Sequence, residues 1–258
     1  MSMVESQGKR HHEHVAQFFG NDVWRLTRNV AAYLYSSLSV GGAAIVVAGD
    51  ARRTAILEQL KNRIRPTGAL IDERIVLLDD DETLGEFMVE GRPDAIRFGE
   101  RIGTLVHELH QRYGCLRAYG EMVGKLWRLK EYSAAAALEA LWNALLERVD
   151  FDLFCGYPID VLAEEFQLSS VRAVLSSHTR LVSALDHSFD IAMHRAMNDV
   201  LGDKSRGLRT LASGEFQNVA ATLPPAERTI LRLRHSLPRY ADDILARARS
   251  YHRYQLAP

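Results

Sequence analysis

The stretch from Leu116 to Pro158, LRAYGEMVGKLWRLKEYSAAAALEALWNALLERVDFDLFCGYP, decides the fold class of this chain. Its apolar pattern changes from continuous runs to helical spacing and back again. It predicts a strand at Leu116–Tyr119, a short helix at Met122–Leu129, a long helix at Ala134–Arg148 and a second strand at Phe151–Cys155. Two strands joined through helices form one crossover unit of a parallel sheet. The strands end in Gly120-Glu121-Met122 and Gly156-Tyr157-Pro158, where open α/β sheets place ligands.

The rest of the chain extends this pattern in both directions. Ala43–Ala48 is continuously apolar, as expected of a strand covered on both faces, and Arg74–Asp79 predicts a second buried strand. Val15–Gly20 predicts a first strand or an edge segment. Strands therefore alternate with helices up to about residue 160, and from Asp186 onward only helical patterning remains. We predict an α/β fold with a mostly parallel, doubly wound sheet of about four or five strands, followed by an all-helical C-terminal segment.

Helical periodicity and capping residues predict the connecting helices. The expected ranges are Val23–Leu38, about Ala51–Ile64, Thr83–Val89, about Ala95–Tyr113, Val161–Phe166, and a helix capped by Ser169-Ser170 that runs to about Leu185.

Composition excludes several protein classes. The formal net charge is −1, which gives the whole molecule no attraction to nucleic acid or anionic membrane. No apolar run reaches the roughly 18 residues of a spanning helix, and the polar N-terminus shows no signal peptide. Cys115 and Cys155 are too few for a disulfide scaffold. We expect a cytoplasmic protein.

The turn after the Ala43–Ala48 strand is where this architecture would carry a phosphate loop. A P-loop needs several glycines, a lysine and a Ser or Thr, whereas this turn has Gly49, Asp50 and no lysine. Arg52 and Arg53 could still meet an anion at the helix N-terminus. A structural turn is the favoured interpretation, and nucleotide binding is the alternative.

Two polar clusters raise the question of metal binding. His11-His12-Glu13-His14 offers three imidazoles and a carboxylate, but no spacing fixes further ligands elsewhere, so a solvated cluster is favoured. The run Asp79-Asp80-Asp81 is explained by N-capping of the next helix. We therefore expect no metal site and no cofactor.

The central stretch also carries candidate ligand contacts. Glu121 follows a buried strand, and it either faces a crevice or caps the next helix; the sequence favours neither. Aromatic and thioether side chains such as Trp127 and Trp142 are usually core, and the alternative is a pocket for a small apolar ligand. Cys155 has no sequence-local base, and no Ser-His-Asp arrangement or GxSxG elbow is present, so we expect no enzyme activity.

The C-terminal segment is basic. From Arg206 onward it holds nine arginines and four acidic residues. Leu223–Leu231 is similar to the opening of a sigma-type helix-turn-helix, but Pro238 falls where the second helix of that motif should run. A helical segment for protein contact or dimerisation is therefore favoured over direct DNA binding.

Several segments together resemble one known family. They are HHEHVAQFF near the start, LDDDETLGEFMVEGRPDAIRF, AYGEMVGKLW, ALEALWNAL, FDLFCGYP and the SSHTRLV segment around His178. In this order they resemble the MEDS domain, the methanogen/methylotroph, DcmR-type sensory domain, over about residues 11–185. The resemblance implies a sensory α/β domain at 11–185, and the residue patterns on either side of it predict a disordered leader at 1–10 and a helical extension at 186–258.

The resemblance implies a RecA/KaiC-like core without a Walker A loop, in a protein that senses small, often one-carbon or hydrocarbon-derived, molecules. Such domains occur alone or fused to DNA-binding, histidine-kinase or sigma-factor-regulating modules. It places these residues facing a ligand: His11, Phe18, Tyr119, Glu121, Met122, Trp142, Asn143, Cys155, Tyr157 and His178.

The expected function is therefore that of a non-enzymatic sensory protein. A small molecule binds at the carboxyl edge of the sheet, and the helical tail signals to a kinase, anti-sigma or transcription-regulator partner, or to a second copy of the chain. One alternative is a RecA/KaiC-like nucleotide-binding protein with weak or no ATPase activity. The other is a transcriptional regulator that binds DNA through its basic C-terminal helices.

Overall fold

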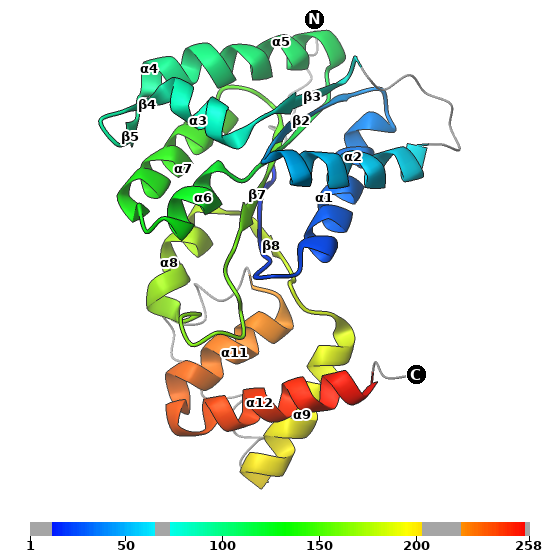
Figure 1. Cartoon of the computed structure of the whole chain (residues 1–258), viewed down its shortest axis with the longest axis vertical. Coiled ribbons are helices and arrows are strands. Elements are labelled where there is room, and N and C mark those ends of the chain that lie inside the picture. The colour runs from blue at the N-terminus through cyan, green and yellow to red at the C-terminus, as the bar shows by residue number, and fades with distance from the viewer. Residues whose placement is uncertain (1–11, 65–72, 203–222, 256–258) are drawn as a thin grey trace, which may run out of the picture.

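A six-stranded, all-parallel sheet forms the centre of the molecule (Figure 1), with strand order β3-β2-β6-β7-β1-β8. The computed structural model describes residues 12–64, 73–202 and 223–255. Its strands are β1 (His14–Phe18), β2 (Ala43–Val47), β3 (Ile75–Leu78), β6 (Leu116–Gly120), β7 (Asp152–Tyr157) and β8 (Arg180–Val182), with a separate small hairpin of β4 (Met88–Val89) and β5 (Arg92–Pro93). The expected leader at 1–10 lies outside the described residues.

The predicted crossover unit is present. Strands β6 and β7 are parallel neighbours, with Ala118 opposite Leu153, and α6 (Met122–Arg128) and α7 (Tyr132–Leu146) connect them. Strand β7 is longer than predicted, because Gly156 and Tyr157 belong to the strand and do not follow it. Gly124 lets α6 lie directly against this strand, since a Cβ at that position would come within 2.1 Å of the Gly156 carbonyl oxygen.

The sheet has more strands than the four or five expected, and the prediction of helices alone after about residue 160 was wrong. Strand β8 lies inside the range predicted as helix up to Leu185, because α8 (Leu168–Ser177) ends eight residues earlier than expected. A three-residue strand is too short to show a period of two. The predicted helix at Val161–Phe166 is a series of turns.

The outer strands also differ from expectation. Strand β1 is not an edge segment, because it pairs with β7 on one side and β8 on the other. Strand β3 lies at one edge of the sheet, opposite β8 at the other, and is only partly buried, with Leu77 38% exposed. Its hydrophobic run correctly predicted a strand, but the expectation that this strand is buried was wrong.

Helices cover both faces of the sheet. Helices α1 (Val23–Leu38) and α2 (Asp50–Ile64) pack on the face that carries Tyr119 and Phe154. Cys155 and Tyr157 point to the opposite face, because side chains alternate along a strand. Helices α6, α7 and α8 lie on that opposite face together with α3 (Asp80–Phe87), α4 (Ala95–Phe98), the π-helical segment Gly99–Gly103 and α5 (Thr104–Tyr113).

In the part of the chain that the structure describes, three helices follow the sheet and lie at one end of it (Figure 1): α9 (His187–Leu201), α11 (Pro225–Ser236) and α12 (Pro238–Gln255). Ile230 of α11 and Ile244 of α12 are fully buried and belong to the same hydrophobic core as the helices on the α7 face. Pro238 opens α12, a position that tolerates proline because no helical hydrogen bond from its nitrogen is needed there. Within the described ranges, no helix is long and apolar enough to cross a bilayer.

Candidate functional site

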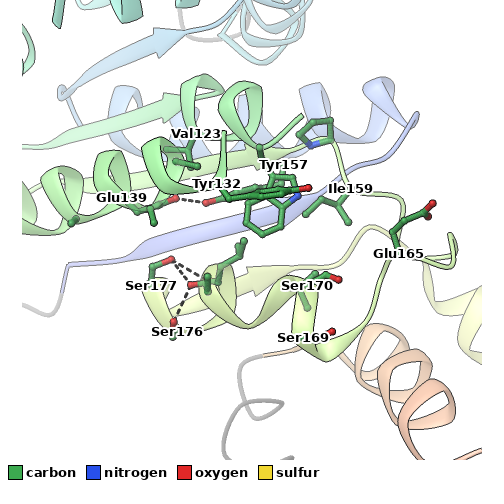
Figure 2. A pocket seen from close by; sticks show the side chains of 18 of the residues that line it. Val123, Tyr132, Glu139, Tyr157, Ile159, Glu165, Ser169, Ser170, Ser176 and Ser177 are labelled. Carbon is green, nitrogen blue, oxygen red and sulfur yellow. Dashed lines mark hydrogen bonds between the residues drawn. The ribbon is translucent and has the colours of Figure 1, made fainter. Parts of the chain in front are cut away.

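A cavity of about 1070 Å³ lies between α6–α7 and α8 (Figure 2). Its wall includes the apolar side chains of Val123, Trp127, Val171 and Val174. The volume is at the upper end of the range typical of small-molecule sites, which are also mainly apolar with a few placed polar groups. The cavity therefore has the size and lining of a binding site for a small organic molecule.

The polar groups of the cavity come from two directions. Helix α8 contributes hydroxyl groups from Ser169, Ser170, Ser176 and Ser177, and Figure 2 shows these serines along one side. Helix α7 contributes Glu139 and Asn143 on the other side, and Tyr157 lines the cavity from β7. The segment after β7, residues 158–165, supplies further lining residues. Hydrogen-bonding groups thus face an otherwise apolar space.

Four buried side chains converge beside this cavity: His14 from β1, Glu139 from α7, Cys155 from β7, and His178, which follows α8. Each offers a nitrogen, oxygen or sulfur atom, and these atoms all lie within 4.8 Å of one another. His14 and Cys155 are 1% exposed, His178 5% and Glu139 6%. We call these four residues the buried cluster.

Hydrogen bonds fix the orientation of both imidazoles in the buried cluster. His14 Nδ1 lies 2.9 Å from Asn143 Oδ1, and His178 Nδ1 lies 2.7 Å from the carbonyl oxygen of Val174. A carbonyl oxygen only accepts, so in the neutral ring the hydrogen is on Nδ1 and Nε2 carries a lone pair. Both Nε2 atoms face Glu139, at 3.4 Å for His14 and 3.5 Å for His178.

Burial changes the protonation of the cluster. It lowers the pKa of His14 and of His178 to about 4, so both imidazoles are neutral near pH 7. Burial raises the pKa of Glu139, against the opposing effects of His14 and of the hydrogen bond that the Tyr157 hydroxyl donates. It also raises the pKa of the Cys155 thiol. The cluster thus has little positive charge of its own to balance the carboxylate.

The cluster and the cavity share residues. Glu139 and Asn143 line the cavity, and so does Tyr157, whose hydroxyl donates to Glu139 Oε1. A molecule in the cavity would therefore lie next to the buried cluster. Of the ten residues expected to face a ligand, Asn143, Cys155, Tyr157 and His178 come together here.

Tyr119 and Glu121 form a separate arrangement. The Tyr119 hydroxyl donates to Glu121 Oε1 at 2.6 Å, and Arg52 pairs with the same carboxylate at 2.9 Å. Burial raises the pKa of Glu121, although Arg52 opposes this. Glu121 stands at the N-terminus of α6, but its side chain makes no capping hydrogen bond, so the capping interpretation is wrong.

The other expected ligand contacts lie in the core or outside the described residues. Phe18 packs edge-on against Phe166, with 5.5 Å between the ring centroids. Trp142 packs against Phe98 in the same way at 5.1 Å, and Met122 is 1% exposed. His11 lies outside the described residues.

The turn that replaces a phosphate loop has its arginines paired. Arg53 contacts Asp50 and Asp79 at 3.3 Å and 3.2 Å, and Arg52 is paired with Glu121. Asp79 caps α3 as expected, because it accepts hydrogen bonds from the backbone of Asp81 and Glu82. The Glu82 hydrogen bond is the main cause that lowers the Asp79 pKa. These carboxylates oppose the approach of a phosphate.

Sequence reasoning missed two members of the cluster. His14 was assigned to a solvated group at the N-terminus, but β1 starts with it and buries it. Glu139 interrupts an apolar helix face, because Ala135, Leu138 and Trp142 around it are all buried. A carboxylate on the buried face of an amphipathic helix is the signal that could have identified it.

The model of the MEDS domain, the MEthanogen/methylotroph, DcmR Sensory domain, matches residues 13–179, which is more than half of the chain. The chain belongs to the MEDS family. No curated protein matches it at a significant level. All four residues of the buried cluster lie inside the MEDS match, whereas α9, α11 and α12 lie beyond it.

Proposed function

We infer that this MEDS protein is a non-enzymatic sensor that binds a small organic molecule in the cavity between α7 and α8. The observation that carries this proposal is the cavity itself: it is large, mainly apolar, and bordered by serine hydroxyls on one side and by Glu139, Asn143 and Tyr157 on the other. The family's description as a sensory domain supports the same role. An amphipathic small molecule, with an apolar body and one or two polar groups, fits this lining.

Contacts between the cavity and the C-terminal helices supply a route for the signal. Arg234 of α11 donates hydrogen bonds to the carbonyl oxygens of Leu162, Ala163 and Phe166, and Arg249 of α12 donates to that of Leu162. Ala163 also lines the cavity. The segment that borders the ligand is therefore held by the helices that follow the sensory domain.

A ligand changes the state of these helices only if it binds one arrangement more tightly than another. In the proposed sensor, the ligand favours one conformation of residues 158–167, and α11 and α12 pass this preference to a protein partner or a second copy of the chain. The nucleotide-binding alternative has less support, because Arg52 and Arg53 are both paired with carboxylates.

Ligand binding by purified full-length protein tests the proposal. A panel of one-carbon and short-chain hydrocarbon derivatives is screened for a rise in melting temperature. Ala136→Trp, which fills the cavity from α7, is expected to abolish the rise. Ser133→Trp, at an exposed position of the same helix outside the cavity lining, is expected to keep it. An equal rise in both variants, or none in wild type, contradicts the proposal.

A further inference from the structure

We propose that the buried cluster of His14, Glu139, Cys155 and His178 is a binding site for a zinc-type divalent transition-metal ion, at the edge of the cavity. The sequence alone favoured no metal here, because it separated His14 from the other three residues. The parallel pairing of β1 with β7 places Ala16 opposite Cys155, so His14 and Cys155 point to the same face of the sheet. Glu139 and His178 reach the same point from α7 and from the end of α8.

The spacing of the donor atoms in the buried cluster is close to that of a tetrahedral metal site. A tetrahedral ion with bonds of about 2.0–2.3 Å holds its ligand atoms roughly 3.3–3.8 Å apart. His14 Nε2 lies 3.4 Å from Glu139 Oε2, His178 Nε2 lies 3.5 Å from Glu139 Oε1, and Cys155 Sγ lies 3.5 Å from His14 Nε2. The remaining pairs of donor atoms lie within 4.8 Å, so movements of about 1 Å bring all four side chains to coordinating distance.

The buried cluster contains more hydrogen-bond acceptors than donors. Among the residues that the structure describes, Glu139 Oε2 and His178 Nε2 are buried side-chain atoms without a hydrogen bond. A buried polar atom without a hydrogen bond destabilises the folded state. Lone pairs of two imidazoles and a carboxylate face one another, with only two donors among them: the Cys155 thiol, 3.5 Å from His14 Nε2, and the Tyr157 hydroxyl, which donates to one carboxylate oxygen. A cation at the centre satisfies all of them.

Both imidazoles of the buried cluster are held by a hydrogen bond at Nδ1. Metal-binding histidines almost always donate their other ring N–H to a carbonyl or carboxylate oxygen, which fixes the ring and increases its basicity. His14 and His178 both have this arrangement, through Asn143 Oδ1 and the Val174 carbonyl oxygen. The side chain of Asn143 therefore orients His14, and Asn143 also lines the cavity.

The donor set selects the class of metal. Two imidazole nitrogens, one thiolate and one carboxylate suit Zn²⁺, Co²⁺ or Fe²⁺, whereas Mg²⁺ and Ca²⁺ prefer oxygen ligands. Binding releases the proton of the Cys155 thiol, and that of Glu139 where the carboxyl is protonated, because the ligating forms are the thiolate and the carboxylate. Metal binding by this cluster does not depend on the proposed sensory ligand.

Cobalt titration of the full chain tests the proposal directly. Protein stripped with a chelator is titrated with Co²⁺ alone. A single equivalent is expected to give the strong visible bands of four-coordinate cobalt and a near-ultraviolet charge-transfer band from the Cys155 thiolate. Cys155→Ser removes that charge-transfer band, and Cys115→Ser, the matched control, leaves it unchanged.

Variants at the buried cluster and at a histidine outside it show whether Co²⁺ binds at the cluster or at other imidazoles. Glu139→Gln and His178→Gln are each expected to weaken Co²⁺ binding at least about tenfold. Removing a residue that only hydrogen-bonds a metal ligand already lowers metal affinity by about that factor, and these two residues are ligands themselves. His12→Ala is expected to have no effect. The proposal is overturned if the bands are absent, if the charge-transfer band persists in Cys155→Ser, or if His12→Ala lowers the Co²⁺ affinity. Glu139→Gln preserves side-chain shape, so it remains informative if the cysteine variant does not fold.

Discussion

Two buried glutamates of this protein have nearly the same exposure and very different surroundings. Glu227 of α11 is 1% exposed and accepts hydrogen bonds from the Ala184 backbone at 2.7 Å and from the Ser183 hydroxyl at 2.9 Å. Glu139 of α7 is 6% exposed, faces two imidazole lone pairs, and has one hydrogen-bond donor, Tyr157. Burial raises the pKa of both carboxyls.

The difference lies in the partners rather than in burial. Glu227 joins α11 to the chain just after β8, and its carboxylate is surrounded by donors, as expected of a structural group. Glu139 is surrounded mainly by acceptors, as expected of a metal ligand whose metal supplies the positive charge. The same residue type therefore supports the fold in one region and binding in the other.

The largest expected effect is at Glu227. Glu227→Leu keeps the approximate side-chain volume but leaves the Ala184 N–H without its acceptor, while the Ser183 hydroxyl can still donate to the carbonyl oxygen of Leu185. The free energy of unfolding is expected to fall by about 2–3 kcal/mol, measured by urea denaturation. Glu108→Leu, at an exposed glutamate, is the control and should change it by less than about 0.5 kcal/mol. If both variants lower the free energy of unfolding by the same small amount, Glu227 has no structural role.

Arg234 tests the same region through its contact with the cavity segment. Arg234→Ala removes the hydrogen bonds to the carbonyl oxygens of Leu162, Ala163 and Phe166. A loss of about 1.5 kcal/mol is expected, the lower end for hydrogen bonds to a charged group. Hydrogen exchange of residues 158–167 should increase in this variant but not in Arg239→Ala, at an exposed position. Unchanged exchange would contradict the proposed route from cavity to tail.

At Glu139 the sign of the effect is expected to reverse. In chelator-treated protein, Glu139→Gln provides an amide N–H₂ that donates to an imidazole Nε2, while its carbonyl oxygen still accepts from Tyr157. The free energy of unfolding is expected to stay constant or to rise by up to about 1 kcal/mol, even though Co²⁺ binding weakens. A clear loss of stability without metal would mean that this carboxylate, like that of Glu227, has a structural role.

The smallest effect concerns pH. Burial raises the pKa of Glu227 above its usual 4.5, so the folded protein holds this proton more tightly than the unfolded chain does. Stability from this group is present at low pH and is lost as pH rises from about 4.5 through the raised pKa. Glu227→Gln does not titrate, so its stability relative to wild type should increase over that range. Urea unfolding at several pH values measures the difference, and parallel curves would refute it.

The sequence predicted the elements whose signals are local. Helix α1 begins and ends where its apolar spacing predicted, and the β6–β7 crossover was found from its alternation of strand and helix patterns. Strand β8 was not predicted, because three residues carry no period and its identity depends on pairing with β1. Local patterns define helices well, whereas a short strand is defined by its neighbours.

The site was predicted only in part, for a related reason. Cys155, Tyr157 and His178 were recognised through the family resemblance, which also placed Tyr119 and Glu121 beside them. The structure puts the Tyr119 ring on the opposite face of the sheet, where its hydroxyl donates to Glu121. Tyr119 is paired with Phe154, and successive side chains along a strand point to opposite faces, so Tyr119 and Cys155 lie on different faces. His14 and Glu139 join the site through contacts between distant segments, which no sequence spacing reveals.

Anomalous X-ray scattering from crystals of the full chain grown with Zn²⁺ tests the central claim most directly. The account predicts a single strong zinc peak about 2.0–2.3 Å from His14 Nε2, His178 Nε2, Cys155 Sγ and a carboxylate oxygen of Glu139. Zinc peaks only at exposed imidazoles, with the four side chains of the buried cluster hydrogen-bonded to one another and no density between them, would contradict it.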